Sequence, residues 1–220
     1  MSNEEKKIDK FSNRENTKFF IFFEWLSKLI ILNMYIIVFA TAGLVVFGFG
    51  PAILAGQKVF LKWKNDEHPE LFKTFWTEYK SHFFIGSILF ITCILFIFLM
   101  VFNLLYFYYN IEPSLFRTLG IFGNFFFIFL TILGFTFTNL FKQKFEVSNM
   151  QAINLSIRYI WAYPKQLLTF LLSIIVLGIG FYLFPQFFMF VSFSIYVAIS
   201  VIVFENSTKH IASKKGDSID

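Results

Sequence analysis

The chain has 220 residues, of which 57% are hydrophobic and only 15% are charged. Ordinary soluble domains carry about 25% charged residues, so a soluble fold of this chain would expose large apolar patches that promote aggregation. The composition therefore excludes an ordinary soluble domain and predicts an integral membrane protein. The formal net charge of +5 does not indicate nucleic-acid binding, because Lys and Arg lie between apolar segments rather than on one soluble module.

Residues 1–18 are polar and rich in charge, and they predict a polar N-terminal segment ahead of a membrane domain over 19–204. The first predicted span covers 30–49, although a helical pattern begins before it. This earlier part carries Glu24 and Lys28, four residues apart in the order that favours an ion pair on one helix face. We expect an interfacial pair, because long charged side chains near helix ends reach for water. A functional charge pair within the membrane is the alternative.

Glycine and proline interrupt the end of this first span. The run GFGP loosens the helical ladder, and backbone groups freed at membrane depth must find partners in protein or in a water-filled cavity. The small residues that follow let another helix approach closely. We predict a corner that leads into the charged segment beyond it, with a broken helix lining a substrate site, as in transporters, as the alternative. The candidate structural or hinge residues are Gly48, Gly50, Pro51, Ala52 and Gly56.

An amphipathic helix is predicted over 69–82, between the first and second spans. One face is apolar and aromatic, and the opposite face carries lysines. Such a helix either lies among lipid headgroups or packs this face on the spanning helices of the same chain, and both interpretations remain open. A weaker amphipathic counterpart is predicted over 147–161. The candidate interfacial face consists of Leu71, Phe72, Phe75, Trp76 and Tyr79.

Four further spans complete a predicted all-α polytopic membrane helical bundle of about five spanning helices. The clearest covers 83–108, where no Asp, Glu, Lys, Arg or His occurs, and the next covers 115–141. Each is longer than the roughly 20 residues that cross a bilayer. The last two, 167–184 and 186–204, form a tight hairpin at Pro185, since proline ends one helix and suits the start of the next.

The distribution of basic residues predicts the orientation. Segments 58–80, 142–165 and 205–220 hold five, four and three Lys or Arg residues, whereas the intervening turns hold one and none. By the positive-inside rule these segments face the cytoplasm, so the tail over 205–220 is predicted to be cytoplasmic. Five spans then place the N-terminus outside, an arrangement that we favour. The alternative is that 30–63 enters and leaves on the same side through the glycine-proline break.

The stretch between Phe39 and Ser87 contains GFGPAILAGQKVFLKW, a short acidic linker and LFKTFWTEYKSHFFIGSIL. In these elements the chain resembles the DUF624 or YesL-like family of bacterial membrane proteins. The later spans agree with that family in number and spacing. The resemblance implies a multi-pass protein of the bacterial cell membrane, often encoded beside genes for carbohydrate uptake and utilisation. It implies no catalytic residues.

The sequence lacks the motifs of metalloproteases, serine hydrolases and P-loop proteins, and its three histidines are far apart. We therefore expect a non-enzyme without cofactor or metal. We predict an accessory or regulatory component linked to carbohydrate uptake or utilisation. Its expected partners are the lipid bilayer and an ABC-type sugar transporter or membrane sensor, and not nucleic acid. The alternative is a small solute transporter or channel that uses the broken first span. A membrane enzyme is the weakest hypothesis, because Glu78 and His82 are interpreted as a solvated pair.

Overall fold

The computed structural model describes residues 3–65, 67–145 and 147–216, and every regular element in these ranges is an α-helix. This confirms the all-α prediction. Residues at both ends of the chain, 1–2 of the N-terminal segment and 217–220 of the tail, lie outside the described ranges. The helices are α1 (Asn3–Ala42), α2 (Phe49–Lys64), α3 (Leu71–Ser81), α4 (Phe83–Asn110), α5 (Leu115–Phe145), α6 (Asn149–Ala162), α7 (Pro164–Leu183), α8 (Pro185–Met189) and α9 (Ser192–Gly216).

Four helical segments are long and apolar enough to cross a membrane. They belong to α1, α4, α5 and α7, and a shorter apolar helix forms the first part of α9. The chain is thus a polytopic helical membrane bundle. Its candidate spans are Lys18–Ala42, Phe83–Asn110, Leu115–Phe145 and Pro164–Leu183.

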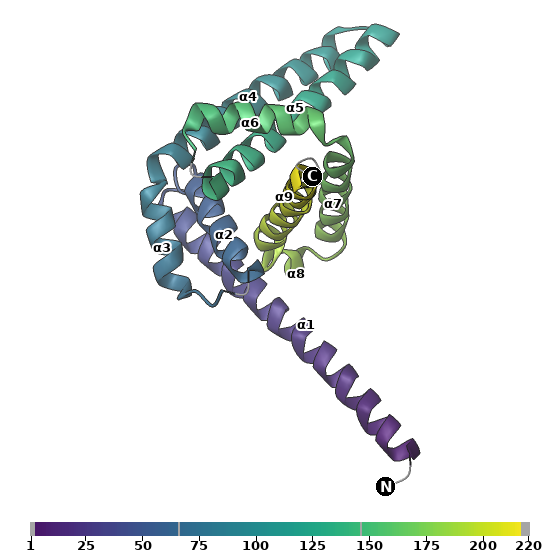
Figure 1. The fold of residues 1–220 in the computed structure, drawn as a ribbon. Helices are drawn as coiled ribbons and strands as arrows, with labels where there is room; N and C mark the ends of the chain where they lie inside the picture. Colours follow the sequence, from purple (N-terminus) through teal and green to yellow (C-terminus); the bar gives the residue numbers. More distant parts are fainter. Residues whose placement is uncertain (1–2, 66, 146, 217–220) are drawn as a thin grey trace.

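The predicted first span, 30–49, differs from the helix that forms. α1 ends at Ala42, a turn covers 43–48, and α2 begins at Phe49. In the turn both Leu44 and Val45 have φ of 59°, a left-handed conformation that ends a right-handed helix. α2 then runs back along α1, so the two helices form an antiparallel hairpin (Figure 1).

Contacts along this hairpin fix its direction. The rings of Trp25 in α1 and Phe60 in α2 lie 5.9 Å apart. Nearer the turn, a Cβ placed on Gly56 would lie 3.1 Å from the Ile36 side chain. Residue numbers therefore rise in α2 as they fall in α1, and the charged ends of both helices lie on the same side of the turn.

The predicted final span, 186–204, is interrupted. The short helix α8 ends at Met189 and α9 begins at Ser192. Asn33 of α1 bridges this junction: its Nδ2 donates to the Met189 carbonyl at 3.0 Å, and its Oδ1 accepts from the amides of Phe193 at 3.0 Å and Ser194 at 3.3 Å. Two helices form instead of one because a side chain from elsewhere satisfies the backbone groups on both sides of the break.

Replacing Asn33 with leucine should destabilise the chain, because three backbone groups would lose their partner and one of them, the amide of Ser194, is buried. Each unsatisfied group costs about 1–3 kcal/mol, and a chain of this size loses about 2–4 °C in Tm for each kcal/mol. Thermal unfolding of the purified protein in detergent measures the effect. Asn103→Leu is the matched control, since Asn103 is exposed on α4. Equal Tm values for the two variants would refute the bridging role of Asn33.

The two amphipathic segments are short helices, α3 and α6. The predicted apolar face of α3 divides into two parts. Phe75 is 0% exposed and Tyr79 is 6% exposed, and the Tyr79 hydroxyl donates to the Phe39 carbonyl of α1 at 3.0 Å. Burial raises the pKa of Tyr79. Phe72 and Trp76 remain 60% and 45% exposed. Half of this face therefore packs on the chain itself, and the other half is free to contact lipid headgroups.

α2 lies at the centre of the fold and contacts α1, α3, α4, α5 and α9. All of its residues from Gly50 to Gln57 are buried. The core extends from α2 into α5 and α9, where Phe137 and Phe204 are 0% exposed. By contrast, the hairpin of α4 and α5 extends away from these packed helices (Figure 1).

Candidate functional site

The candidate hinge residues lie where helices approach most closely. A Cβ placed on Gly50 would lie 2.2 Å from the Gly86 carbonyl oxygen of α4, and one placed on Gly48 would lie 2.4 Å from the Ala40 carbonyl oxygen of α1. Pro51 and Ala52 are also buried. Gly56 faces the Ile36 side chain of α1. These residues therefore permit close contact among α1, α2 and α4, because only glycine leaves room for a neighbouring backbone.

Four polar residues form a buried polar seam where α2, α5 and α9 meet. We define this seam as Gln57, Asn139, Gln143 and Ser200. The Gln57 Nε2 donates to Ser200 Oγ at 3.3 Å, and the Gln143 Nε2 donates to the Leu54 carbonyl at 2.7 Å. Asn139 precedes Gln143 by four residues and so lies on the same face of α5. The polar seam thus joins three helices that are distant in sequence.

Several hydrogen-bonding atoms of the polar seam have no partner among the described residues. Gln57 and Asn139 are 0% exposed and Gln143 is 6% exposed. Among the described residues, no group bonds to the Oε1 atoms of Gln57 and Gln143 or to either amide atom of Asn139. Leaving such a group unpaired costs about 1–3 kcal/mol, and buried polar atoms without protein partners commonly bind water, an ion or a ligand.

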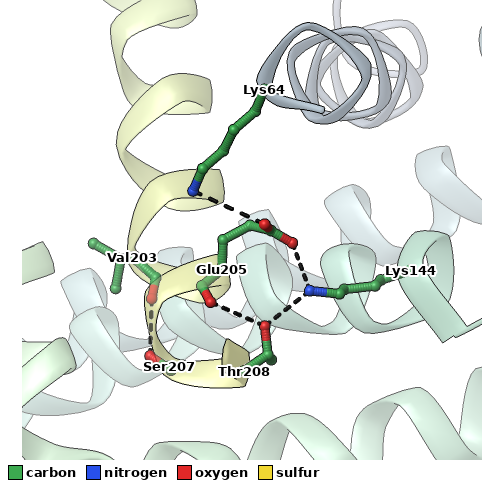
Figure 2. Close-up of polar contacts among 6 residues, drawn as sticks. All are labelled: Lys64, Lys144, Val203, Glu205, Ser207 and Thr208. Atoms are coloured by element: carbon green, nitrogen blue, oxygen red, sulfur yellow. Dashed lines mark hydrogen bonds and ion pairs between the residues drawn. The ribbon is translucent and has the colours of Figure 1, made fainter. Parts of the chain in front are cut away.

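A charged cluster lies at the C-terminal ends of α2 and α5, beside α9. Figure 2 shows Glu205 of α9 between Lys144 of α5 and Lys64 at the end of α2. The Lys144 Nζ donates to Glu205 Oε1 at 2.5 Å and to Thr208 Oγ1 at 2.9 Å, and the Lys64 Nζ lies 4.0 Å from Glu205 Oε2. The Glu205 side chain is only 7% exposed. One buried carboxylate thus links the C-terminal ends of α2 and α5 to α9.

The sequence pattern does not predict this cluster, because Glu205 follows the last apolar run and falls within the predicted tail over 205–220. α9 instead continues as a helix through this point, and Ser207 is 0% exposed. The Ser207 hydroxyl lies 2.7 Å from the Tyr159 hydroxyl of α6, and burial raises the pKa of Tyr159 to about 12. Continued helical spacing from Val197 through Val201 to Phe204 and Thr208 is the signal that could have revealed a buried face here.

The other predicted site residues lie apart from the polar seam. The Lys28 Nζ is 2.6 Å from Glu24 Oε1, with side chains 26% and 48% exposed. The same ammonium lies 5.1 Å from the centre of the Trp25 ring. Exposed pairs of this kind contribute about 0–1 kcal/mol. Within the described ranges, His, Cys, Asp and Glu form no group of three that could hold a metal ion.

The all-helical fold and its four candidate spans define a polytopic helical membrane protein. Within it, residues 29–104 match the family described as "Protein of unknown function, DUF624". The match confirms the resemblance over the later part of α1, all of α2 and α3, and most of α4. The glycine contacts lie inside the matched segment, whereas Asn139, Gln143 and Glu205 lie outside it.

A similar protein is the "Uncharacterized protein YteU" of Bacillus subtilis (strain 168). It is 38% identical to this chain over 69 residues, which cover 31% of this chain and 31% of the relative. The chain therefore spans about a third of the length of the curated relative that it matches. No solved structure matches this chain.

Proposed function

We propose that this chain is a non-enzymatic accessory or regulatory component of a complex in the bacterial cell membrane, linked to carbohydrate uptake or utilisation. One observation carries the proposal. The hairpin of α4 and α5 extends away from the packed helices (Figure 1), and none of the most hydrophobic window of α4 is buried inside the chain. The outer part of this hairpin packs little on its own chain and is suited to lie against helices of another membrane protein.

The surface of this hairpin supports the same proposal. A Cβ placed on Gly123 or on Gly134 of α5 would meet no atom within 4 Å. Small residues on the surface of membrane helices let a partner helix approach closely, which favours helix association in lipid. Exposed aromatic residues follow Gly123 in α5, among them Phe126, which is 53% exposed. The surface therefore combines open positions for a partner backbone with large side chains that pack beside it.

The partner class follows from the family resemblance. An ABC-type sugar transporter or a membrane sensor would supply spanning helices for the hairpin, and the lipid bilayer would cover the remaining apolar surface. The charged segment over 58–80 is proposed to lie on the cytoplasmic side together with the C-terminal tail. There it would meet the soluble parts of such a partner.

A second candidate is a small solute transporter or channel. The unpartnered amide groups of the polar seam favour it, because they lie beside α2, the helix that follows the break in the first span. Such groups could bind polar solutes during transport. In this case the purified chain alone would move a solute across a vesicle membrane.

Site-specific photo-crosslinking distinguishes the two candidates. A photoreactive phenylalanine analogue at position 126 of the hairpin should crosslink a transporter subunit or a sensor in native membranes, to be identified by mass spectrometry. The same analogue in place of Leu172 on α7 is the control, since the two side chains are 53% and 54% exposed. If crosslinks to such a protein are missing and the purified chain alone transports a solute, the accessory proposal is wrong.

A further inference from the structure

A polar pocket of about 320 Å³ lies between α2, α3 and α5, at the edge of the polar seam. This volume falls in the range of roughly 300–1,000 Å³ that is typical of small-molecule sites. The pocket is separate from the α4–α5 surface on which the proposed function depends. Its lining residues are Lys58, Glu78, His82, Lys142, Gln143 and Val147.

Two lysines give this pocket a positive balance. Lys58 and Lys142 are both half-buried, and the Lys58 Nζ makes a long hydrogen bond of 3.4 Å to the backbone carbonyl of Gln143. Within the described ranges, the ion pairs within 4.0 Å include neither of these ammonium groups. The pocket therefore holds two cations against the single carboxylate of Glu78. An anion that enters it gains two charge-assisted contacts.

Gln143 also lines this pocket. It is 94% buried, since its exposed fraction is 6%, and its Nε2 donates to the Leu54 carbonyl at 2.7 Å. Its Oε1 is fully buried as well, so the amide of Gln143 belongs to the polar seam. The groups left to bind a ligand are the charged and imidazole side chains of the lining.

The α3 region supplies an acceptor to the pocket. Glu78 and His82 face each other, with 3.5 Å between the His82 Nδ1 and the Glu78 Oε2. The carboxylate accepts hydrogen bonds from hydroxyl groups, whereas the two lysines are donors for an anion. A matching ligand therefore carries both an anionic group and hydroxyl groups.

We propose that this pocket binds a phosphate ester that carries free hydroxyl groups. Lys58 and Lys142 bind the phosphate oxygens, and the Glu78 carboxylate accepts a hydrogen bond from a ligand hydroxyl. Both a glycerol-phosphate lipid headgroup and a free polyol or sugar phosphate have this chemistry. α3, with its exposed Phe72 and Trp76, forms one wall of the pocket.

Binding to the full-length protein in a neutral detergent tests the proposal by calorimetry. The probes are short-chain phosphatidylglycerol, glycerol 1-phosphate and, as a zwitterionic control, short-chain phosphatidylcholine. Binding of phosphatidylglycerol alone identifies a lipid headgroup site, and binding of glycerol 1-phosphate as well identifies a site for free phosphate esters. Either result supports the proposal. Equal binding of phosphatidylglycerol and phosphatidylcholine, or binding of no probe, overturns the proposal. This comparison uses only the unmodified protein.

Variants then locate the site. Lys58→Gln together with Lys142→Gln should weaken binding of the responsive probe by about tenfold or more, since it removes two charge-assisted hydrogen bonds. The matched control is Lys73→Gln together with Lys80→Gln, which changes the same charge on exposed positions of α3. Its affinity should stay within about twofold of the parent. Equal losses in both double variants would show non-specific attraction and overturn the assignment.

Discussion

Substituting Gly50 with alanine should lower the stability of the fold more than its single added methyl group suggests. The new Cβ would lie 2.2 Å from the Gly86 carbonyl oxygen and 2.8 Å from its carbonyl carbon. These are backbone atoms of another helix, so α2 and α4 must separate. Overpacking of this kind costs about 1–3 kcal/mol, which corresponds to about 2–4 °C in Tm for each kcal/mol.

Gly123→Ala is the matched control, because it makes the same change in a helix with no atom within 4 Å of the new Cβ. Alanine is the better helix former by about 1 kcal/mol, so this variant should be as stable as the parent or more stable. Thermal unfolding of both proteins in one detergent measures the difference. A Gly50→Ala variant that unfolds at the same temperature as Gly123→Ala would show that α2 and α4 do not pack as described.

The second large effect is expected at Glu205. Glu205→Gln keeps the shape of the side chain but removes the charge between Lys144 and Lys64. Breaking a buried ion pair by removing one partner costs about 3–5 kcal/mol. We expect the lower end, about 3 kcal/mol, because the side chains of Lys144 and Lys64 are 29% and 23% exposed and water can reach them.

An exposed pair provides the control for this experiment. Glu70→Gln removes the partner of Lys73, where the two side chains are 80% and 79% exposed, and its expected cost is about 0–1 kcal/mol. Unfolding temperatures in detergent, measured at low and high salt, compare the two substitutions. If they lower the Tm equally, the carboxylate of Glu205 does not link α2 and α5 to α9.

Sequence patterns predicted those helices whose signal is local. α4 follows from an apolar run without charge, and α3 follows from aromatic residues at helical spacing on one face. The class of fold and the family resemblance could be predicted in the same way, since both depend on neighbouring residues. The helices that form within the predicted first and last spans have other bounds, and the break between α8 and α9 depends on a distant contact. Asn33 lies far in sequence from the α8–α9 junction that it bridges.

The candidate site could be predicted only in part. Gly48 and Gly50 can be identified from the sequence alone, because two glycines and a proline interrupt an apolar run. Glu205 does not, because a carboxylate after an apolar segment usually marks its exit into water. Its burial depends on Lys144 and Lys64, which come from other helices. Helical spacing in the sequence indicates a buried face that continues to Thr208, but it does not indicate which lysines meet Glu205 there.

The turn between α1 and α2 has a consequence for how this part of the chain meets the bilayer. Its tip, Leu44 to Phe47, is apolar and exposed, and the amides of Gly43, Leu44, Val45 and Val46 all donate to carbonyls within the hairpin. Because α2 returns along α1, this apolar tip and the basic residues Lys62 and Lys64 at the end of α2 lie at opposite ends of the hairpin. The hairpin therefore has one apolar end and one basic end, and a separation of this kind orients a helix pair relative to a bilayer surface.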